Sequence, residues 1–488
     1  MATLLDVLDA AVNHHMAGRL AEAAQDYRVV LAVEPEQADA LHLLGVAEAQ
    51  RGAHAAAAAL IVRSLRLRPG AAQPWANLGG ALRAQGEAER ADAALTRALA
   101  LDPALPDALA NLGAGRHTLA DYPSALDWLE RAARLRPGHP DTLLNRGVVL
   151  RDARRFAESD ACLDALLEAR PDHAEAHLAR AVSRLVRGDL RSGWEAFEWR
   201  PRRLPAPPWS GEPLEGRRIL LHAEQGFGDT IQFARYAPLV ARAGGRVILD
   251  VHPLQHRLLR SLGPDIQVLV RGPAPAPHDV HCPLMSLPRA FGTDLASIPA
   301  PPSYLAAEPD ETARWGRRIA DVETGMGSGG PRVGLVWAGN PKHRNDRNRS
   351  IPADRLAPLL ALPGLRLFSL QTGDARAARP AALPDLTAGI RDFADSAAIL
   401  ANLDLVIAVD TATIHLAGAL GVPAWLLLPY APDWRWLLER ADSPWYPSLR
   451  LFRQPRPGDW DSVLHTVATA LERFAANRSA QFAPQKQS

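Results

Sequence analysis

Apolar and polar residues follow a helical period through the first 200 residues, and the whole pattern recurs every 34 residues. Each unit holds two amphipathic helical patterns separated by a short polar turn, such as "RGAH", "QGEAE" or "LADYP". A proline closes each unit, because proline cannot continue a helix interior. Three sets of residues recur at intervals of 34: the prolines Pro35, Pro69, Pro103, Pro137 and Pro171; the glycines Gly45, Gly79, Gly113 and Gly147; and the small residues Ala23, Ala57, Ala91, Ala125 and Ser159. The pattern predicts five closely packed helix pairs, and a sixth that departs after "VRGDL".

This repeat resembles the tetratricopeptide repeat (TPR), and residues 76–103, "ANLGGALRAQGEAERADAALTRALALDP", are a near-consensus copy. The resemblance covers about residues 4–200, and we assign residues 1–200 to the array. It implies an all-α solenoid whose concave face commonly binds peptides or partner proteins. The competing interpretation is a scaffold or an oligomerisation arm. Because the groove residues are mixed in character, the sequence predicts a protein or peptide partner without identifying it.

After residue 200 the pattern changes to short apolar runs that alternate with helical segments. The Pro-rich stretch 201–214 is predicted to be a linker. The runs that predict strands are "RRILLHA", "RVILDV", "IQVLV", "PRVGLVWAG", "LRLFSL", "LDLVIAVD" and "PAWLLLP". This alternation is typical of parallel sheets with crossover helices. We therefore expect two Rossmann-like lobes, 215–310 and 311–476, followed by a disordered tail, 477–488.

Composition narrows the choice of function classes. The net charge of +1 gives no indication of a nucleic-acid partner. Two cysteines far apart in the chain argue against a disulfide scaffold and fit a reducing cytoplasm. We see no signal peptide, and no apolar run reaches the ~20 residues of a membrane-spanning helix. We therefore expect a cytoplasmic protein without a transmembrane segment.

The first candidate for chemistry is "HAEQGFGDTIQF", residues 222–233, which follows a predicted strand. Its glycines permit a tight loop, and Asp229 begins the next helix. A carboxylate at that point can act as general base toward an acceptor hydroxyl. The competing interpretation is structural, because Asp229 with Gln232 three residues later is typical of a helix cap.

A second candidate, "WAGNPKHRNDRNRSIP", residues 337–352, opens from another strand end. It contains Asn340 and five basic residues, Lys342, His343, Arg344, Arg347 and Arg349. Arginine offers bidentate hydrogen bonds to phosphate, so the loop is predicted to clamp a diphosphate. A solvated run of charge is the alternative.

The third candidate is "VDTATIHLAGALGVP", where a buried strand turns into a helix. Small residues at Thr411, Ala412 and Thr413 leave backbone N–H groups free at the helix start, which favours an anion. His415 in the first turn can donate to a phosphate or sugar oxygen. The alternative is that Asp410 or Thr411 caps the helix and His415 is a buried core histidine. The aromatic residues of "PYAPDWRWLLERADSPWYPS" can stack on a base or sugar, but packing is the favoured interpretation for most of them.

Together these stretches resemble the bacterial heptosyltransferases, a glycosyltransferase family with the two-lobed GT-B fold. Gly228 and Asp229 match the family's early "GD" loop, "RSIP" is a looser counterpart of its "K-x-W-P" element, and "DTATIHLAGALGVP" matches "DTG-x-x-HLA-x-A-x-G-x-P". The resemblance covers about residues 215–455. It implies metal-independent hexosyl or heptosyl transfer from a nucleotide sugar, with no other cofactor and with Asp229 as base. The residues that it assigns to the donor are Gly228, Asn340, Lys342, Arg349, Asp410, Thr411, Ala412, Thr413 and His415.

The chain also departs from that family. Ala412 replaces a glycine, the first lobe is short, and heptosyltransferases carry no repeats. Repeats joined to a GT-B domain are similar in architecture to the O-linked N-acetylglucosamine transferases, which glycosylate proteins. The sequence therefore predicts an α plus α/β chain that glycosylates a protein or peptide bound by the TPR array. The alternatives are a non-catalytic assembly factor with a degenerate transferase domain, and a transferase acting on a glycan or lipid.

Overall fold

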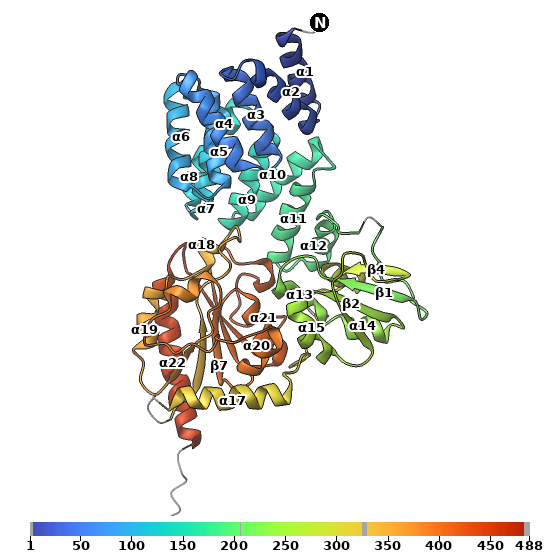
Figure 1. Cartoon of the computed structure of the whole chain (residues 1–488). Coiled ribbons are helices and arrows are strands. Elements are labelled where there is room, and N and C mark those ends of the chain that lie inside the picture. The colour runs from blue at the N-terminus through green and yellow to red at the C-terminus, as the bar shows by residue number, and fades with distance from the viewer. Residues whose placement is uncertain (1–2, 205, 325–328, 483–488) are drawn as a thin grey trace, which may run out of the picture. The chain divides into compact units, whose positions relative to one another are not determined.

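In a computed structural model of the chain, the described residues are 3–204, 206–324 and 329–482. The chain forms two compact units, Met1–Ala176 and His177–Ser488 (Figure 1). The boundary between them falls inside helix α11 (Ala174–Val186), not at the expected residue 200. It lies there because the end of the sixth helix pair packs within the second unit: Trp194 of α12 (Leu190–Phe197) is buried and donates from Nε1 to the Thr293 carbonyl at 3.1 Å.

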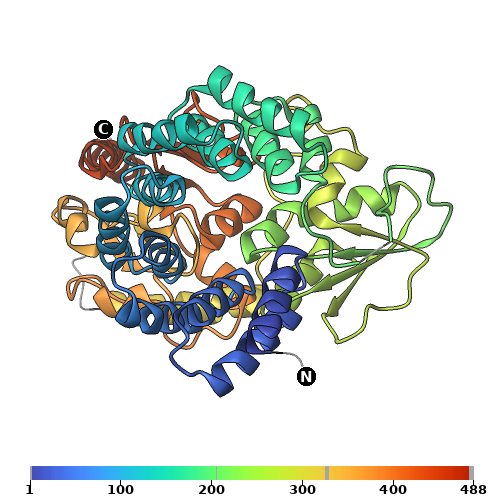
Figure 2. The same cartoon turned by 90° about the horizontal axis from the view of Figure 1, so that it is seen from above.

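The first unit consists of consecutive helix pairs, as the 34-residue pattern predicts, and Figure 2 shows these pairs following a curved path. In four of these pairs a glycine of the first helix faces a large residue of the second. A Cβ atom on Gly79 would lie 2.5 Å from Cγ of Leu95, so only glycine allows this spacing. Gly45, Gly113 and Gly147 have equivalent neighbours. The helices are α1 (Leu4–Met16), α2 (Leu20–Val33), α3 (Ala38–Gln50), α4 (His54–Leu67), α5 (Ala72–Ala84), α6 (Ala88–Leu101), α7 (Pro106–Thr118), α8 (Tyr122–Leu135), α9 (Pro140–Asp152) and α10 (Phe156–Ala169), followed by the start of α11.

A left-handed residue ends the turn inside each helix pair, again at steps of 34 residues. Glycine fills this position at Gly18, Gly52, Gly86 and Gly188, where a positive φ carries no steric cost. Ala120 (φ 57°) and Arg154 (φ 63°) occupy it in the fourth and fifth pairs. The fixed backbone geometry of the turn therefore overrides the preference of these two residues.

The second unit contains two parallel β-sheets, as the alternating pattern predicts. The first sheet has the order β3-β2-β1-β4 and the second has the order β6-β5-β7-β8-β9. Every pairing within them is parallel. The strands are β1 (Arg218–His222), β2 (Arg246–Val251), β3 (Ile266–Val270), β4 (Val280–Pro283), β5 (Arg332–Val336), β6 (Arg366–Ser369), β7 (Leu405–Val409), β8 (Ala424–Leu428) and β9 (Leu449–Arg453).

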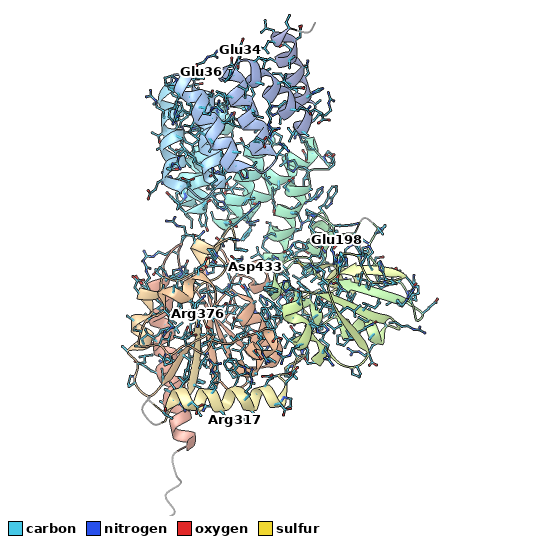
Figure 3. All side chains as sticks on the ribbon, in the orientation of Figure 1. Glu34, Glu36, Glu198, Arg317, Arg376 and Asp433 are labelled. Atoms are coloured by element: carbon cyan, nitrogen blue, oxygen red, sulfur yellow. The ribbon has the colours of Figure 1, made fainter. Side chains whose placement is uncertain are left out.

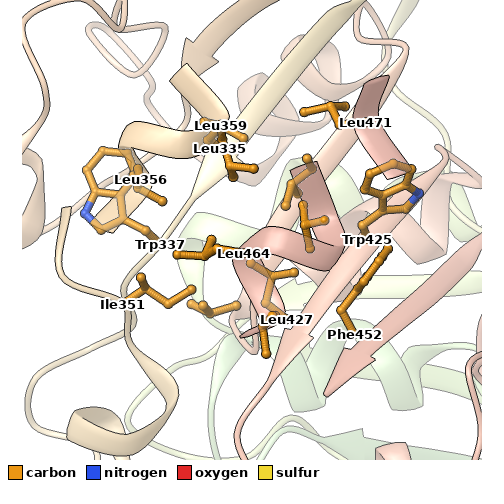
Figure 4. Packing of buried hydrophobic residues seen from close by; sticks show 14 of the residues in the cluster. Leu335, Trp337, Ile351, Leu356, Leu359, Trp425, Leu427, Phe452, Leu464 and Leu471 are labelled. Carbon is orange, nitrogen blue, oxygen red and sulfur yellow. The ribbon is translucent and has the colours of Figure 1, made fainter. Parts of the chain in front are cut away.

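Helices and one large apolar cluster cover the second sheet. Figure 4 shows buried side chains such as Leu335, Trp337 and Leu427 packed against Leu464 and Leu471 of the last helix. The α-helices are α13 (Phe227–Ala234), α14 (Ala237–Arg242), α15 (Pro253–Leu259), α16 (Leu287–Ala290), α17 (Pro309–Glu323), α18 (Asp346–Arg349), α19 (Ala357–Leu360), α20 (Phe393–Leu400), α21 (Ala412–Leu420) and α22 (Trp460–Phe482). The 3-10 turns are η1 (Arg260–Leu262), η2 (Leu284–Ser286), η3 (Ala353–Leu356), η4 (Asp374–Ala378) and η5 (Trp434–Trp436).

The structure differs from the sequence-based expectation at three places. The stretch 201–214 is not a free linker, because Trp209 is buried and its backbone N–H donates to the His281 carbonyl of β4 at 2.7 Å. The helical pattern of "DTIQFARYAPLVARAG" predicts a single helix after β1, but the structure has two, α13 and α14, since Pro238 cannot continue a helix and starts a new one. The predicted tail 477–488 begins inside α22, which reaches Phe482, and residues 483–488 lie outside the described residues.

Candidate functional site

Two strand ends from different sheets meet within the second unit. The loop after β1 leads into α13, and the turn after β7 leads into α21, which packs against α13. The contact is close: a Cβ atom on Gly228 would lie 2.7 Å from Cδ2 of His415. Glycine at this position therefore lets the two motifs recognised in the sequence approach each other. The site forms at the carboxyl ends of parallel strands, where such sheets bind ligands.

Asp229 of α13 makes two contacts that stabilise negative charge. One carboxylate oxygen accepts a hydrogen bond from the Gly226 backbone N–H at 2.8 Å, and the other accepts one from the Arg435 guanidinium. The side chain is 19% exposed, so it remains accessible. The helix-cap interpretation is thus right in part, since Asp229 caps its own helix through Gly226, although Gln232 takes no part in the cap.

Arg435, in η5 after β8, is the central cation of the site. It is buried, and its guanidinium donates to Gln232 Oε1 at 2.6 Å and to Asp433 Oδ1 at 2.9 Å, as well as to Asp229. Burial would lower its pKa, but the carboxylates of Asp433 and Asp229 outweigh burial and raise that pKa above the ordinary value. Arg435 is therefore a permanent positive charge between α13 and the second sheet. Figure 3 labels Asp433, its acidic partner.

Asp410 follows β7 and lies on the other side of the site. Burial, together with the nearby carboxylate of Asp433, raises its pKa to about 6, against the opposite influence of Arg349 and Arg435. Arg349 donates to the Asp410 backbone carbonyl at 2.9 Å and to the Asp346 carboxylate at 3.1 Å. This pair of bonds turns the Arg349 side chain into the protein, where it is 15% exposed.

His415 is buried in the first turn of α21 and is neutral. Its Nδ1 lies 2.9 Å from the Tyr446 hydroxyl, and its Nε2 lies 3.8 Å from Oδ1 of Asp410. Burial and the charge of Arg435 hold its pKa well below the ordinary value of 6.5. A neutral imidazole acts as a hydrogen-bonding group here and adds no positive charge for a phosphate.

The start of α21 has no side-chain cap among the described residues, although Thr411 stands at the N-cap position. The hydroxyl of Thr411 is buried without a hydrogen-bond partner in the described part of the chain, as is Nε2 of Gln232. The interpretation that Asp410 or Thr411 caps this helix is therefore wrong. The first N–H groups of α21, around Ala412 and Thr413, stay available to an anion.

The predicted donor residues do not all come together. Gly228, Asp229, Arg349, Asp410 and the stretch 411–415 lie around the contacts described above. Asn340 and Lys342 are exposed, and Asn340 Oδ1 accepts from the Lys342 backbone N–H at 3.0 Å in a local turn. Across the described residues, no hydrogen bond or ion pair connects either of them to Asp229, Asp410 or His415. Arg344 and Arg347 are exposed as well. His343 is also exposed, but the charges of Arg349, Asp433 and Asp229 act on it, whereas Arg349 itself is partly buried.

Sequence reasoning missed Arg435, Asp433, Gln232 and Tyr446 as members of the site. The available signal was the "DWRW" segment shortly after a predicted strand, which places a lone arginine between two tryptophans. The nearby aromatics pack as expected, since Trp434, Trp436, Trp445 and Tyr446 are all buried.

The described residues contain neither a candidate membrane-spanning helix nor a candidate metal site. No helix there combines the length and apolar character needed to cross a membrane. In the same residues, no group of three or more His, Cys, Asp or Glu side chains is arranged to hold a metal ion.

Comparison with known families identifies the N-terminal repeats. Tetratricopeptide repeat models match residues 9–72 and 144–192, and a second such model matches residues 72–105. The N-terminal region is built from tetratricopeptide repeats. The helix pairs of the first unit are the structural form of these repeats.

Among curated proteins, the chain is similar to Protein FlbA of Caulobacter vibrioides (strain ATCC 19089 / CIP 103742 / CB 15). The two are 31% identical over 335 residues, which cover 61% of this chain and 55% of FlbA. The chain thus spans about half the length of this relative. The aligned part is longer than the first unit, which ends at Ala176, so the similarity extends into the second unit.

Solved structures similar to the chain cover about two fifths of it. The Pseudomonas aeruginosa pilF protein is 20% identical and covers 40% of this chain and 88% of its own, with a TM-score of 0.34. The APC/C hetero-tetramer Cut9–Hcn1 is 20% identical over 41% of each chain, with a TM-score of 0.39. YrrB, titled a TPR protein with an unusual peptide-binding site, is 20% identical over 37% of this chain and 95% of its own, with a TM-score of 0.28.

Proposed function

We propose that the chain is a cytoplasmic glycosyltransferase with a GT-B-type second unit, which transfers a sugar from a nucleotide-sugar donor to a protein or peptide held by the TPR array. One observation carries the proposal: the Asp229 loop of the first sheet and the uncapped start of α21 in the second sheet meet in a single site. A group-transfer enzyme needs a base on one side and an anion site on the other, and this arrangement supplies both.

The donor diphosphate is placed at the start of α21, beside Arg349. Free N–H groups and the helix dipole favour negative charge there, and a guanidinium adds bidentate hydrogen bonds. When the bond between the sugar and the phosphate breaks, the electron pair stays on the leaving phosphate oxygen. Arg349 and the α21 N–H groups stabilise that charge, so the proposed mechanism uses no metal ion. The buried hydroxyl of Thr411 is a further donor for the same group.

Asp229 is the proposed base. It takes the proton of an acceptor hydroxyl while the hydroxyl oxygen bonds to the anomeric carbon of the sugar. Arg435 donates to one oxygen of the Asp229 carboxylate and the Gly226 N–H donates to the other, so one acceptor position on each oxygen is occupied. A carboxylate has about four acceptor positions, so the remaining lone pairs are open to the acceptor. Arg435 orients the carboxylate in this proposal.

Binding of nucleoside diphosphates tests the donor site. We expect one of UDP, GDP, ADP or CDP, or CMP, to stabilise the full-length chain against heat. A ligand at 100 times its dissociation constant adds about 2.7 kcal/mol, which is a rise of roughly 2–4 °C in Tm for a unit of this size. Arg349→Gln should abolish the shift, whereas Arg347→Gln, an exposed arginine of the same loop, should keep it.

Transfer itself is tested with Asp229→Ala. We expect the variant to lose sugar transfer to a protein acceptor and to keep the nucleotide-dependent shift in Tm. Transfer at the wild-type rate by Asp229→Ala would exclude Asp229 as the base.

A second candidate function is a non-catalytic TPR assembly factor. The ion pair between Asp229 and Arg435 favours it, because a buried cation already occupies one oxygen of the carboxylate that would bind the acceptor hydroxyl. Failure of every nucleotide to shift the Tm of a well-folded sample would support this second candidate.

A further inference from the structure

A buried arginine outside the site links the end of the last helix of the repeats to the loop that leads into α13, the helix of Asp229. Arg200 follows α12, and its side chain is only 5% exposed. It donates to both oxygens of Glu224, from Nε at 3.3 Å and from NH2 at 2.9 Å. The same guanidinium donates to Glu198 at 2.9 Å and to the Ser286 hydroxyl at 2.7 Å. Figure 3 labels Glu198 within this cluster.

Glu224 belongs to the short connection between β1 and α13. It stands two residues beyond the end of β1 and five residues before Asp229. Its carboxylate is 7% exposed, so its orientation depends on protein partners and not on water. Burial raises the pKa of Glu224, and Arg200 acts in the opposite direction. A second hydrogen bond holds the β1–α13 loop, since the Arg271 guanidinium donates to the Ala223 carbonyl.

The contacts of Arg200 thus reach three elements at once. Glu198 lies at the end of α12, Ser286 lies in η2 after β4, and Glu224 lies at the end of β1. An arginine presents its donors in a rigid planar fork, so holding one carboxylate through two bonds also fixes the direction of that carboxylate. Glu224 accordingly fixes the backbone that leads to Gly226, whose N–H in turn binds Asp229.

We propose that Arg200 is a positioning residue that holds the β1–α13 loop, and with it Asp229, in place against the last helix of the repeat array. This inference rests on the proposed function for its effect on transfer, but not for its effect on the loop. Arg200 touches neither donor nor acceptor in this proposal.

A set of variants separates the loss of the Arg200–Glu224 ion pair from the loss of the fold. Arg200→Met leaves the buried carboxylate of Glu224 without its cation, which by itself destabilises a protein. The double variant Arg200→Met/Glu224→Met removes that uncompensated charge, and Glu198 keeps the Ser286 hydroxyl as a donor at 2.8 Å, so the variant should fold without the ion pair. Arg200→Lys keeps the positive charge but loses the planar guanidinium that binds both oxygens of Glu224. Arg289→Gln is the matched control, since it removes a 3.0 Å ion pair between α12 and α16 at the surface without touching the loop.

Two measurements on the full chain test the inference. Amide hydrogen exchange should become faster at residues 223–228 in the double variant, while residues 412–420 of α21 keep the wild-type rate. In the transfer assay, kcat should fall roughly 10- to 100-fold, as expected for a displaced catalytic group, with the nucleotide-dependent Tm shift unchanged. Arg200→Lys should give an intermediate kcat, and Arg289→Gln should match the wild type.

The outcomes distinguish this inference from the proposed function. Wild-type exchange at 223–228 in the double variant would overturn the positioning role, as would faster exchange spread evenly over the second unit. If the wild-type chain transfers no sugar to any acceptor, the proposed function fails, and the exchange measurement still decides whether Arg200 holds the loop.

Discussion

Burial acts in opposite directions on the two titratable residues of the β7–α21 turn. Charge is costly away from water, so burial favours the protonated form of Asp410 and the unprotonated form of His415. Arg435 keeps its positive charge, because its carboxylate partners outweigh burial. The site therefore combines the fixed charge of Arg435 with a His415 that adds no positive charge and an Asp410 that is fully ionised only well above about pH 6.

Asp410 gives a pH-dependent prediction. Its pKa of about 6 in the folded chain lies above its ordinary value of 3.8. The folded state therefore holds the proton more tightly, and the free energy of unfolding contributed by Asp410 falls as the pH rises from about 4 to about 6. We expect Asp410→Asn to stabilise the second unit at pH 7.5, by on the order of 2–3 kcal/mol, and by only about 1 kcal/mol at pH 4.5, which lies just above the ordinary pKa.

Urea unfolding followed by tryptophan fluorescence checks this prediction, because ten of the twelve tryptophans lie in the second unit. Asp461→Asn is the control, since that carboxylate is 81% exposed. An equal effect of Asp410→Asn at both pH values would show that Asp410 is ionised at pH 4.5.

At the scale of elements, the repeats depend on glycines that act in two different ways. Gly79 allows helix α5 to approach α6, whereas Gly80 on the same helix has only the Asn111 side chain near it, at 3.5 Å. We expect Gly79→Ala to destabilise the array by about 1–3 kcal/mol through overpacking against Leu95. Gly80→Ala should be neutral or stabilising by up to about 1 kcal/mol, because alanine favours helix. Urea unfolding followed by far-ultraviolet circular dichroism compares the two variants, and equal stability would contradict the close approach.

At the scale of the whole molecule, the two units carry separable tasks in the proposed function. An acceptor held by the array reaches the transfer site at a raised effective concentration, while the donor binds the second unit alone. We expect Gly79→Ala to raise the KM for a protein acceptor roughly tenfold or more and to leave the nucleotide-dependent Tm shift intact. Initial-rate kinetics with a folded protein acceptor and with a short peptide check this. An equal KM for both acceptors in wild type and variant would mean that the array does not present the acceptor.

How far the sequence predicted the molecule depends on the range of the interactions. The 34-residue step fixed the helix pairs of the first unit, because each pair packs on its neighbours in sequence. The apolar runs located seven of the nine strands found in the described residues. The short strands "VHCP" (β4) and "LRLFR" (β9) were missed. Strand β4 has only 4 residues, and arginines interrupt the apolar residues of β9, as in an exposed segment. The split between α13 and α14 was readable in principle from Pro238.

The same difference between local and long-range contacts applies to the candidate site. Gly228, Asp229 and the stretch 410–415 were predicted, because strand-end motifs carry their own local geometry. The sequence alone determined the repeats, the two parallel sheets and the motifs at their strand ends, since period and spacing record contacts between neighbours in the chain. Only the tertiary structure decided that Arg435 holds Asp229, that Arg349 of the basic loop binds the Asp410 carbonyl, and that Arg200 binds Glu224. Those contacts join residues far apart in the sequence, and whether a charge is buried or exposed depends on chain segments that no local pattern reveals.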